Sequence, residues 1–498
     1  MSRSGRKSGP AGRAGGWSAI AAVALLGGCG GSGGGSSAAP APVVTAPPVN
    51  QAPSFTSAAT ASVVENAAGD IYRPTATDPE GSAVTYAISG GADAARFALV
   101  NGQLRFATPP NYDLPADADE NNVYLVQLSA SDGSAASTLD LQVTVTNDKE
   151  GVGVHRIATG FDQPMGMVPI PGDNRVFVPE RGGRIYLFDP TSGARTLFLT
   201  VAVSTAGEGG LAAIAPMADY ATSGEFMVLY TSASGGFSLQ LGRRSGTFGG
   251  PELTSQFAAF ATLPAGSSAT GWMQLGPDGK IYVATSDALG ATDPSNGAAA
   301  PGSIFGKLLV VERNPDPYAG ATIQSYLTRR IAGGLRFPRG GTFIDGRLLL
   351  ADRGADTWHE LDLVDLTAGG NFGWPYREGT QALRSDGPSG LADPVLEYRY
   401  GTGPAMGTGV VSGAVYRGPI ASLAGHYLFA DRRGEIFTTA ASRLTAGQLT
   451  TGPAIERRRA DFAPDAGQLN QPTAIVTDAS GSIYILDAGG DIFRVDPA

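Results

Sequence analysis

Side chains suited to acid–base or nucleophilic chemistry at neutral pH are scarce in this sequence. It contains three histidines, His155, His359 and His426, and a single cysteine, Cys29. Imidazole titrates near neutral pH, so the histidines are the first candidates for proton transfer. The sequence has no HExxH, CxxC, GKS/T or nucleophile-elbow motif, which argues against a zinc hydrolase, a P-loop enzyme and an α/β-hydrolase.

An internal repeat indicates which elements position such groups. The sixteen residues Arg175–Pro190 return as Ser482–Pro497. Each copy has an apolar run, a Gly-Gly turn and a second run ending in Asp-Pro, which predicts two strands and a tight turn. Similar pieces occur at His426–Phe437, Gly279–Asp287 and Gly346–Gly354. Such repetition predicts a β-propeller over residues 151–498; six to eight blades of roughly 40 to 55 residues would fit, and we expect six.

Composition supports an all-β protein. Charged residues make up 16% of the 498 residues, and the chain has 71 glycines and 34 prolines, which suit many turns. The net charge is −10 and no basic stripe is present, so a nucleic-acid partner is not expected. The basic cluster Arg457–Arg459 is expected to be a solvated loop.

The amino terminus combines basic residues, an apolar run at 17–26 and the sequence Leu-Gly-Gly-Cys ending at Cys29. The run is too short to span a membrane. This segment resembles a bacterial lipoprotein signal, which implies removal of residues 1–28 and acylation of Cys29. Membrane lipid would then hold the exported protein at a periplasmic or cell-surface leaflet.

An ordinary signal peptide followed by an unrelated cysteine is the alternative. The lipid interpretation gains support because Cys29 is the only cysteine, so no disulfide competes for it. Residues 29–53 are rich in Gly, Ser and Pro and are expected to form a tether.

Residues 54–150 show short alternating runs separated by turn clusters, typical of a β-sandwich of about seven strands. Their acidic motifs VVEN, ATDPEG, NYDLPADADENNVYLVQLSASDG and VTVTND resemble a single cadherin-like (Ig-like) repeat. In cadherins the corresponding carboxylates bind Ca²⁺ between successive repeats. The resemblance implies six candidate ligands here: Glu65, Asp78, Glu80, Asp113, Asp132 and Asp148.

With only one repeat, half of each interdomain Ca²⁺ site would have to come from the propeller. The alternative is that these carboxylates only solvate turns.

The propeller region contains, in order, IATGFDQPMGM, GEGGLAAIAPMADY, GWMQLGPDGKIYVATSD, FGKLL, GLRFPRGGTF, HELDLVDLTAGGNFGWP and AVYRG. This order and these motifs resemble the glucose/sorbosone dehydrogenase family, the soluble PQQ-dependent aldose dehydrogenases. The resemblance implies a six-bladed β-propeller with PQQ and Ca²⁺ as cofactors.

In that family a histidine takes the proton from the sugar C1 hydroxyl while hydride passes to PQQ. The matching position here is Ser268, which cannot act as a base unaided. The aspartate that orients the histidine matches Asp287, and a glutamine near the substrate has become Glu208. Glu208 could replace the base if burial raised its pKa; an ordinary turn carboxylate is the alternative.

None of the three histidines restores the base directly. His359 replaces the aspartate of the family's Asp-Glu pair, beside Glu360, and could face the central channel. His155 and His426 fall in strand-like runs, so we expect structural roles for both.

The cofactor-binding positions are mixed. Arg336 matches the arginine of the family's RNP motif, and Arg432 is the counterpart of another PQQ-facing basic residue. Two later arginines of the family fall on Gln471 and Thr473, which leaves less charge for a tricarboxylate such as PQQ. The backbone carbonyls that hold the catalytic Ca²⁺ match Gly354 and Ala355, which are implied by the resemblance alone.

Two functions remain open. The first is a divergent PQQ-dependent dehydrogenase that oxidises an aldose or a related alcohol. The second is a non-catalytic surface protein that binds a glycan or a partner protein. Loss of the base histidine favours the second, while retention of Asp287 and Arg336 favours the first. Fold alone does not decide between them.

Overall fold

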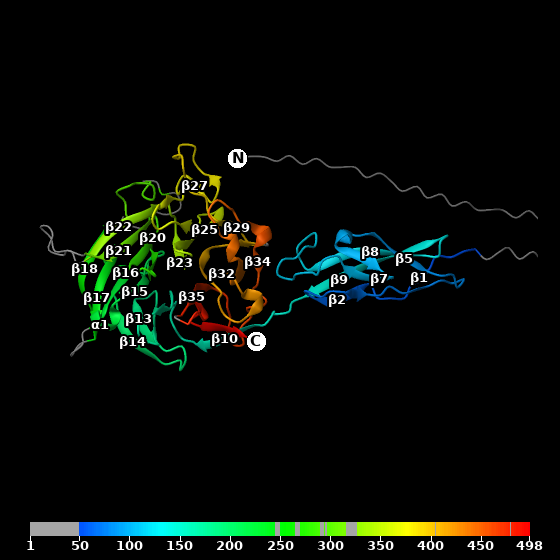
Figure 1. Cartoon of the computed structure of the whole chain (residues 1–498), viewed down its shortest axis with the longest axis horizontal. Coiled ribbons are helices and arrows are strands. Elements are labelled where there is room, and N and C mark those ends of the chain that lie inside the picture. The colour runs from blue at the N-terminus through cyan, green and yellow to red at the C-terminus, as the bar shows by residue number, and fades with distance from the viewer. Residues whose placement is uncertain are drawn as a thin grey trace, which may run out of the picture. The chain divides into compact units, whose positions relative to one another are not determined.

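A computed structural model of the chain describes residues 49–498 except 245–249, 264–268, 289–292, 294–295, 315–325, 404 and 479 (Figure 1). Residues 51–498 form one compact unit. The predicted signal segment, Cys29 and most of the tether therefore lie outside the described residues. In the part that is described, no helix is long and apolar enough to cross a membrane.

Nearly all regular structure in the described residues is β, as the composition predicted. The helices are single turns: α1 (Tyr220–Ser223), η1 (Ala94–Arg96), η2 (Ala421–Leu423), η3 (Ala441–Arg443) and η4 (Gly452–Ala454).

The amino-terminal strands form two sheets that share one core. One sheet has the order β2 (Thr60–Val64), β9 (Ala136–Thr146), β8 (Val123–Ser131) and β5 (Thr85–Gly90); the other has β3 (Asp70–Tyr72), β7 (Gln103–Phe106) and β6 (Phe97–Val100); β1 (Ser54–Phe55) pairs with β4 (Ala76–Thr77). Along β8 buried and more exposed side chains alternate, because successive residues of a strand point to opposite faces. Leu104, Tyr124 and Leu128 pack in the core between the sheets.

Residues 152–497 form a β-propeller in which the described residues make six sheets of four or five strands. Sheet by sheet, the strands are β11 (Val168–Pro169), β12 (Val176–Pro179), β13 (Arg184–Phe188) and β14 (Arg195–Thr200); β15 (Leu211–Pro216), β16 (Glu225–Thr231), β17 (Gly236–Arg244) and β18 (Pro251–Thr262); β19 (Gly271–Leu275), β20 (Ile281–Thr285), β21 (Lys307–Arg313), β22 (Tyr326–Gly333) and β26 (Gly370–Asn371); β23 (Pro338–Ile344), β24 (Arg347–Asp352), β25 (Trp358–Val364), β29 (Leu396–Tyr400) and β30 (Met406–Gly407); β31 (Val410–Val415), β32 (His426–Asp431), β33 (Glu435–Ala440) and β34 (Glu456–Arg457); and β35 (Pro472–Thr477), β36 (Ile483–Asp487), β37 (Ile492–Pro497) and β10 (Val152–Ala158). A separate short ribbon pairs β27 (Arg377–Glu378) with β28 (Gln381–Ala382).

The predicted repeat is confirmed as two equivalent hairpins, β12–β13 and β36–β37. Their turns place Gly183 at φ 100° and Gly490 at φ 97°, a left-handed region that other residues rarely adopt. A Cβ on Gly183 would also lie 2.2 Å from the carbonyl oxygen of Val201. Each turn therefore needs glycine for both conformation and space.

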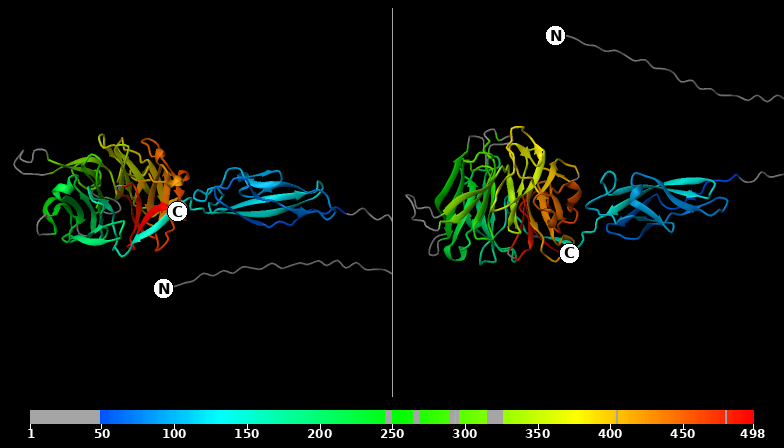
Figure 2. Two further views of the ribbon diagram at one scale, coloured as in Figure 1. Left: turned by 60° about the horizontal axis from the view of Figure 1, so that its bottom comes forward. Right: turned by 45° about the horizontal axis from the view of Figure 1, so that its top comes forward.

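The ring closes through pairing of the first and last strands. β10 pairs with β37, so that Val152 lies opposite Pro497 and Val154 opposite Val495. One sheet thus contains both ends of the propeller segment, and the other sheets follow one another around the ring in chain order (Figure 2). This arrangement leaves no long unpaired edge between the first and last sheets.

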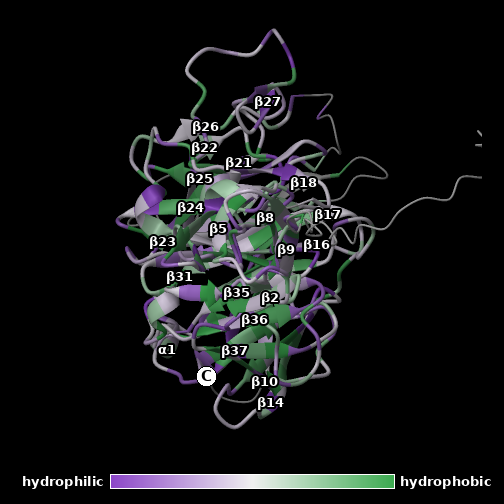
Figure 3. Ribbon diagram, turned by 90° about the vertical axis from the view of Figure 1, so that its right-hand side faces the viewer, coloured by the Kyte–Doolittle hydropathy of each residue, from purple (hydrophilic) through white to green (hydrophobic). Residues whose placement is uncertain are grey.

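The edge strands β11, β15, β19, β23, β31 and β35 surround a central channel. β15 packs against β19, β19 against β23, β23 against β31, and β31 against β35. Hydrophobic residues are concentrated in the strands and polar residues in the loops (Figure 3). The strands thereby form a rigid support for side chains on the loops and around the channel.

Candidate functional site

Loops that follow several blade strands surround a polar cavity of about 550 Å³, which we call the arginine pocket. Its charged lining residues are Arg181, Glu208, Arg339, Arg432 and Asp487. Gln471 and Thr473, where the resemblance placed two lost arginines, also line it. The structure therefore brings Glu208 and Arg432 together, and adds arginines that sequence reasoning did not single out.

Glu208 is the central carboxylate of this pocket. Its Oε1 lies 2.9 Å from Nη2 of Arg353 and 3.7 Å from Nη1 of Arg432. Burial alone would raise the pKa of Glu208, but the charges of Arg353, Arg339 and Arg432 hold it below its ordinary value. The condition under which Glu208 would replace the missing base, a raised pKa, is therefore not met.

Two arginines fix the walls of the pocket. Arg181 donates hydrogen bonds to the carbonyl oxygens of Thr205 (2.9 Å) and Gly209 (3.0 Å), which hold the loop that carries Glu208. The guanidinium of Arg353 lies over the ring of Phe337, 4.0 Å from its centre. Phe337 replaces the asparagine of the family motif, and here it supports a cation.

Arg339 differs from these two. No hydrogen bond or ion pair to another described residue involves its guanidinium. Burial, and then the nearby charge of Arg353, lowers the pKa of Arg339 to about 10. A half-buried cation without a carboxylate partner favours an anionic ligand.

Arg336 occupies the place that the resemblance assigned to a metal. Its Nη1 donates to the carbonyl oxygens of Arg353 (2.9 Å) and Gly354 (2.5 Å), and its guanidinium lies 5.3 Å from the Trp374 ring centre. The amide of Ala355 is bound by the Glu378 carboxylate. A Ca²⁺ ion on the Gly354 carbonyl would lie beside a fixed positive charge, so Gly354 and Ala355 do not fit the predicted Ca²⁺ role.

Asp287 is buried beside this arginine, with 3% of its surface exposed. Its Oδ2 accepts a hydrogen bond from Nε1 of Trp374 at 2.9 Å. Burial raises the pKa of Asp287 to about 7, against the opposing charge of Arg336. Asp287 does not line the arginine pocket, and Ser268 lies outside the described residues.

Acids at the matching position of other sheets have a structural role. Asp431 accepts backbone hydrogen bonds from Thr408 and Gly409, and Asp487 does so from Asn470 and Gln471. Each carboxylate thus ties the loop that leads into the edge strand of its own sheet. Asp287 lies two residues beyond the end of β20 and accepts from an indole instead.

The expectation that His359 faces the channel is wrong. Its residue surface is 0% exposed in β25, its Nδ1 accepts a hydrogen bond from the Gly354 amide at 3.2 Å, and its ring packs against Tyr398. Burial lowers the pKa of His359 to about 4, so the ring is neutral at pH 7. His155 pairs with Asp465 at 2.9 Å in β10, and His426 begins β32.

A second charged group joins the amino-terminal sheets to the propeller. We call it the interface cluster: Glu65, Asp113, Glu150, Arg458 and Asp461. Arg458 lies 2.9 Å from Asp113, 2.8 Å from Glu150 and 2.5 Å from Asp461. Its side chain is 2% exposed, so the prediction that Arg457–Arg459 is a solvated loop is wrong at Arg458.

The interface cluster has more carboxylates than cations. Oxygens of Glu65, Asp113 and Asp461 lie within 4.8 Å of one another, in a geometry able to hold a metal ion. One oxygen of Asp113 and one of Asp461 are buried without a hydrogen-bond partner. Burial and the Asp461 charge raise the pKa of Asp113 well above its ordinary value. These residues fit a cation.

The other predicted Ca²⁺ ligands are arranged differently. The Asp148 amide donates to Glu65 at 2.9 Å, next to the cluster. Asp78 accepts from the Glu80 and Ser82 amides, and Asp132 from the Ser134 and Ala135 amides, so both stabilise turns. Of the described acids, only Glu65 and Asp113 from the predicted set join the three-carboxylate group with Asp461.

Sequence reasoning missed Arg339, Arg353 and Asp461. A usable signal existed for Arg339, which stands inside the strand PRGGTFI, where a charge between a proline and two glycines serves no turn. For Arg353 the sequence held no signal, because Glu208 is 145 residues away. For the three-carboxylate group it held none either, because Glu65 and Asp113 are more than three hundred residues from Asp461.

Comparison with known proteins gives one family match: the model of glucose/sorbosone dehydrogenases matches residues 161–455, more than half of the chain. Two curated relatives from Arabidopsis thaliana, the HIPL1 and HIPL2 proteins, are 28% and 30% identical over 206 and 205 residues. Each match covers 34% of this chain and 29% of the relative's length.

Solved structures show the same fold. The PQQ-bound aldose sugar dehydrogenase of Streptomyces coelicolor is 22% identical, with a TM-score of 0.51 over 69% of this chain and 97% of its own. An oxidoreductase from Thermus thermophilus, described as a glucose dehydrogenase, is 20% identical, with a TM-score of 0.52 over 70% of this chain and all of its own.

Proposed function

Because this chain belongs to the glucose/sorbosone dehydrogenase family, we propose that its arginine pocket binds a polycarboxylate quinone of the PQQ type and that the protein oxidises an aldose or a related alcohol. The observation that supports this most is the charge of the pocket. Arg181, Arg339 and Arg432 line it together with Glu208, which forms ion pairs with Arg353 and Arg432.

These arginines compensate for the two that the family has at Gln471 and Thr473. Guanidinium groups bind carboxylates through charge-assisted hydrogen bonds, often two at a time. Arg339 and Arg432 would hold the acid groups of the cofactor, while Arg181 and Arg353 keep the Glu208 loop in place. A bound PQQ would supply the two-electron acceptor for the alcohol. The six sheets are, in this proposal, the six blades of the family's propeller.

The pocket is poorly equipped to remove the proton from the alcohol. Glu208 lines the pocket, yet its ion pair with Arg353 and its lowered pKa make it a poor base at pH 7. His359 is buried away from the pocket, and Asp287 is held by Trp374. We therefore expect turnover far below that of an enzyme with the histidine base.

The alternative function is a binding protein for a glycan or a partner protein, without redox chemistry. Arg336 favours it, because this side chain already satisfies the Gly354 carbonyl that the family gives to its catalytic Ca²⁺. In that case the arginine pocket would bind an anionic ligand and release it unchanged.

The test is a titration of residues 51–498 with PQQ, with and without Ca²⁺, followed by dye-linked turnover on a panel of aldoses. Saturable binding that weakens about tenfold in Arg432→Gln would support the cofactor site. Sugar-dependent dye reduction would then establish the dehydrogenase reaction. If PQQ does not bind at micromolar concentration, the enzyme proposal is wrong and the binding alternative stands.

The amino-terminal sheets are proposed to be a cadherin-like sandwich that binds Ca²⁺ at the interface cluster. Support comes from the unpartnered oxygens of Asp113 and Asp461 and from the excess of carboxylates around Arg458. Millimolar Ca²⁺ should raise the melting temperature of the wild type but not that of Asp461→Asn. Asp78→Asn, in a turn, is the matched control and should respond as the wild type does.

An exported, lipid-anchored location completes the proposal. Its support is the Leu-Gly-Gly-Cys sequence before and at Cys29, the only cysteine. The full chain expressed in a bacterium should partition into the detergent phase, and Cys29→Ser should partition into the aqueous phase. Equal partitioning of the two would refute acylation of Cys29.

A further inference from the structure

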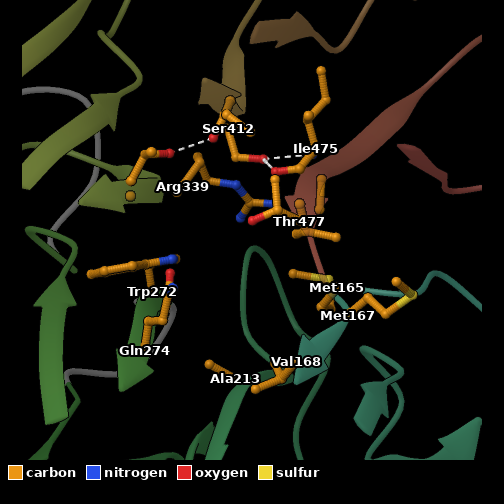
Figure 4. Close-up of a pocket in the computed structure, with 18 of the residues that line it drawn as sticks. Met165, Met167, Val168, Ala213, Trp272, Gln274, Arg339, Ser412, Ile475 and Thr477 are labelled. Atoms are coloured by element: carbon orange, nitrogen blue, oxygen red, sulfur yellow. Dashed lines mark hydrogen bonds between the residues drawn. The ribbon is translucent and has the colours of Figure 1, made fainter. Parts of the chain in front are cut away.

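A second cavity, of about 260 Å³, lies inside the propeller ring; we call it the channel cavity. It is lined by residues on or next to the edge strands of all six sheets, among them Met167, Ala213, Trp272, Phe343, Ser412 and Ile475 (Figure 4). The cavity therefore belongs to the ring as a whole rather than to one blade. Of the residues predicted from the sequence as catalytic or cofactor-binding, those that the structure describes do not line it.

The wall of the channel cavity is largely apolar. Met165, Met167 and Val168 lie on one side, with Trp272 across the cavity from them (Figure 4). Methionine and tryptophan offer polarizable surfaces that adapt to flat or irregular apolar groups. The wall is suited to an aromatic ring or a short hydrocarbon chain.

Several polar groups on the wall are already satisfied. The Ser412 hydroxyl donates to the Ile475 carbonyl at 3.1 Å and accepts from the Ile475 amide at 2.7 Å. The Thr342 hydroxyl donates to the Gly413 carbonyl at 2.5 Å. These hydroxyls hold neighbouring blades together, so they offer little to a ligand.

Arg339 lies where the channel cavity meets the arginine pocket. Met165, Arg339 and Thr473 line both cavities, which makes the two spaces contiguous. The guanidinium of Arg339 has no hydrogen bond or ion pair to another described residue. Arg417, the other arginine that lines the cavity, is exposed to solvent, whereas Arg339 is half-buried.

The glycines after Arg339 leave room for this arrangement. A Cβ on Gly341 would lie 2.8 Å from the Trp272 ring, and one on Gly340 would lie 2.1 Å from Cβ of Ser412. Glycine at these positions lets β23 pass close to both neighbours next to the long side chain of Arg339.

From this arrangement we propose that the channel cavity binds an anionic ligand with an apolar body, an aromatic or short aliphatic carboxylate, whose acid group contacts Arg339. The apolar body would replace water along Trp272 and the methionines, which favours binding in proportion to the area buried. The carboxylate would give Arg339 the partner it lacks, through charge-assisted hydrogen bonds in a partly desolvated setting. This site shares Arg339 with the proposed cofactor site, whereas Trp272 lines the channel cavity alone. The proposal for the channel cavity does not depend on whether PQQ binds.

The experiment uses residues 51–498 and a matched pair of probes, 2-naphthoate and its neutral counterpart 2-naphthalenemethanol, in calorimetric titrations. The wild type should bind naphthoate at least about tenfold more tightly than the alcohol, the effect expected of one hydrogen-bonded charge. Arg339→Gln should remove that preference, and Arg339→Lys should keep most of it. Trp272→Ala should weaken both probes while leaving PQQ titration unchanged.

Arg417→Gln is the matched control, because it removes the other cation of the same cavity. It should leave the preference for naphthoate intact; loss of the preference in this variant instead of Arg339→Gln would refute the assignment of the acid group. Equal binding of the two probes by the wild type, or no binding of either at millimolar concentration, would overturn the proposal. Melting temperatures of all variants show whether a loss of binding reflects unfolding.

Discussion

The interface cluster and the arginine pocket have the same arrangement of charges with opposite signs. In the first, Arg458 is surrounded by Asp113, Glu150 and Asp461. In the second, Glu208 is contacted by Arg353 and Arg432, with Arg339 nearby. Each has one central charge and an excess of the opposite sign, so each is incomplete: the interface cluster lacks a cation and the arginine pocket lacks an anion.

Burial separates their roles. The Arg458 side chain is 2% exposed, whereas Glu208 is 36% and Arg432 51% exposed. Water does not solvate the charges of a buried cluster, so an excess of one sign changes the free energy of folding. An open pocket is screened by water and can exchange one anion for another, so its imbalance affects ligand binding. Clusters of charged side chains thus connect the amino-terminal sheets to the propeller in one place and form a binding site in the other.

The largest expected effect comes from removing the central cation of the buried cluster. Arg458→Met leaves Asp113 and Asp461 without their partner and should lower the free energy of unfolding by about 3–5 kcal/mol. Thermal or urea unfolding of residues 51–498 measures it. Arg459→Met, which removes a half-exposed pair with Glu435, should cost less than about 1 kcal/mol. If Arg458→Met and Arg459→Met lose the same free energy of unfolding, burial does not explain the importance of Arg458.

A smaller effect follows from the pKa of Asp113. Because the folded-state pKa is raised, the stabilising contribution of this group is complete below its unfolded value and is lost as pH rises through the folded value. Asp113→Asn should therefore gain melting temperature relative to the wild type on going from pH 4 to pH 8 without Ca²⁺. The exposed Asp140→Asn should show no such trend. If the melting temperature of Asp113→Asn instead falls relative to the wild type as pH rises, the assigned direction of the pKa shift is wrong.

The contribution of Glu208, in the arginine pocket, to stability should change with pH in the opposite direction to that of Asp113. Its effect should be the smallest of the three. The folded-state pKa of Glu208 is lowered, so its contribution to stability is present above the unfolded value and is lost as pH falls through the folded one. With Glu208 partly exposed, Glu208→Gln should cost less than about 1 kcal/mol at pH 7.

The same variant should bind PQQ more tightly, because a negative charge leaves the pocket. Calorimetric titration of Glu208→Gln beside the wild type measures the gain. Weaker binding would mean that Glu208 itself contacts the cofactor.

The sequence determined the regular parts of this protein. Period-two patterns and Gly-Gly turns located the hairpins β12–β13 and β36–β37, because alternation and positive φ are local properties of a few residues. The motifs from GEGGL to GGNFGWP predicted the family. Glu208 and Arg432 were placed near each other by the resemblance, and they meet in the structure at 3.7 Å.

Only the tertiary structure decided what those residues can do. Glu208 could have replaced the missing base if burial had raised its pKa, but Arg353, 145 residues away, reverses the direction. Arg458 was expected to be exposed to solvent, but it is buried and forms an ion pair with Asp113 from the amino-terminal part of the chain. His359 could have faced the channel but is buried instead. For Glu208 and Arg458 the deciding partners Arg353 and Asp113 are distant in sequence. Charge interactions depend on distance in space, which pattern and spacing along the chain do not encode.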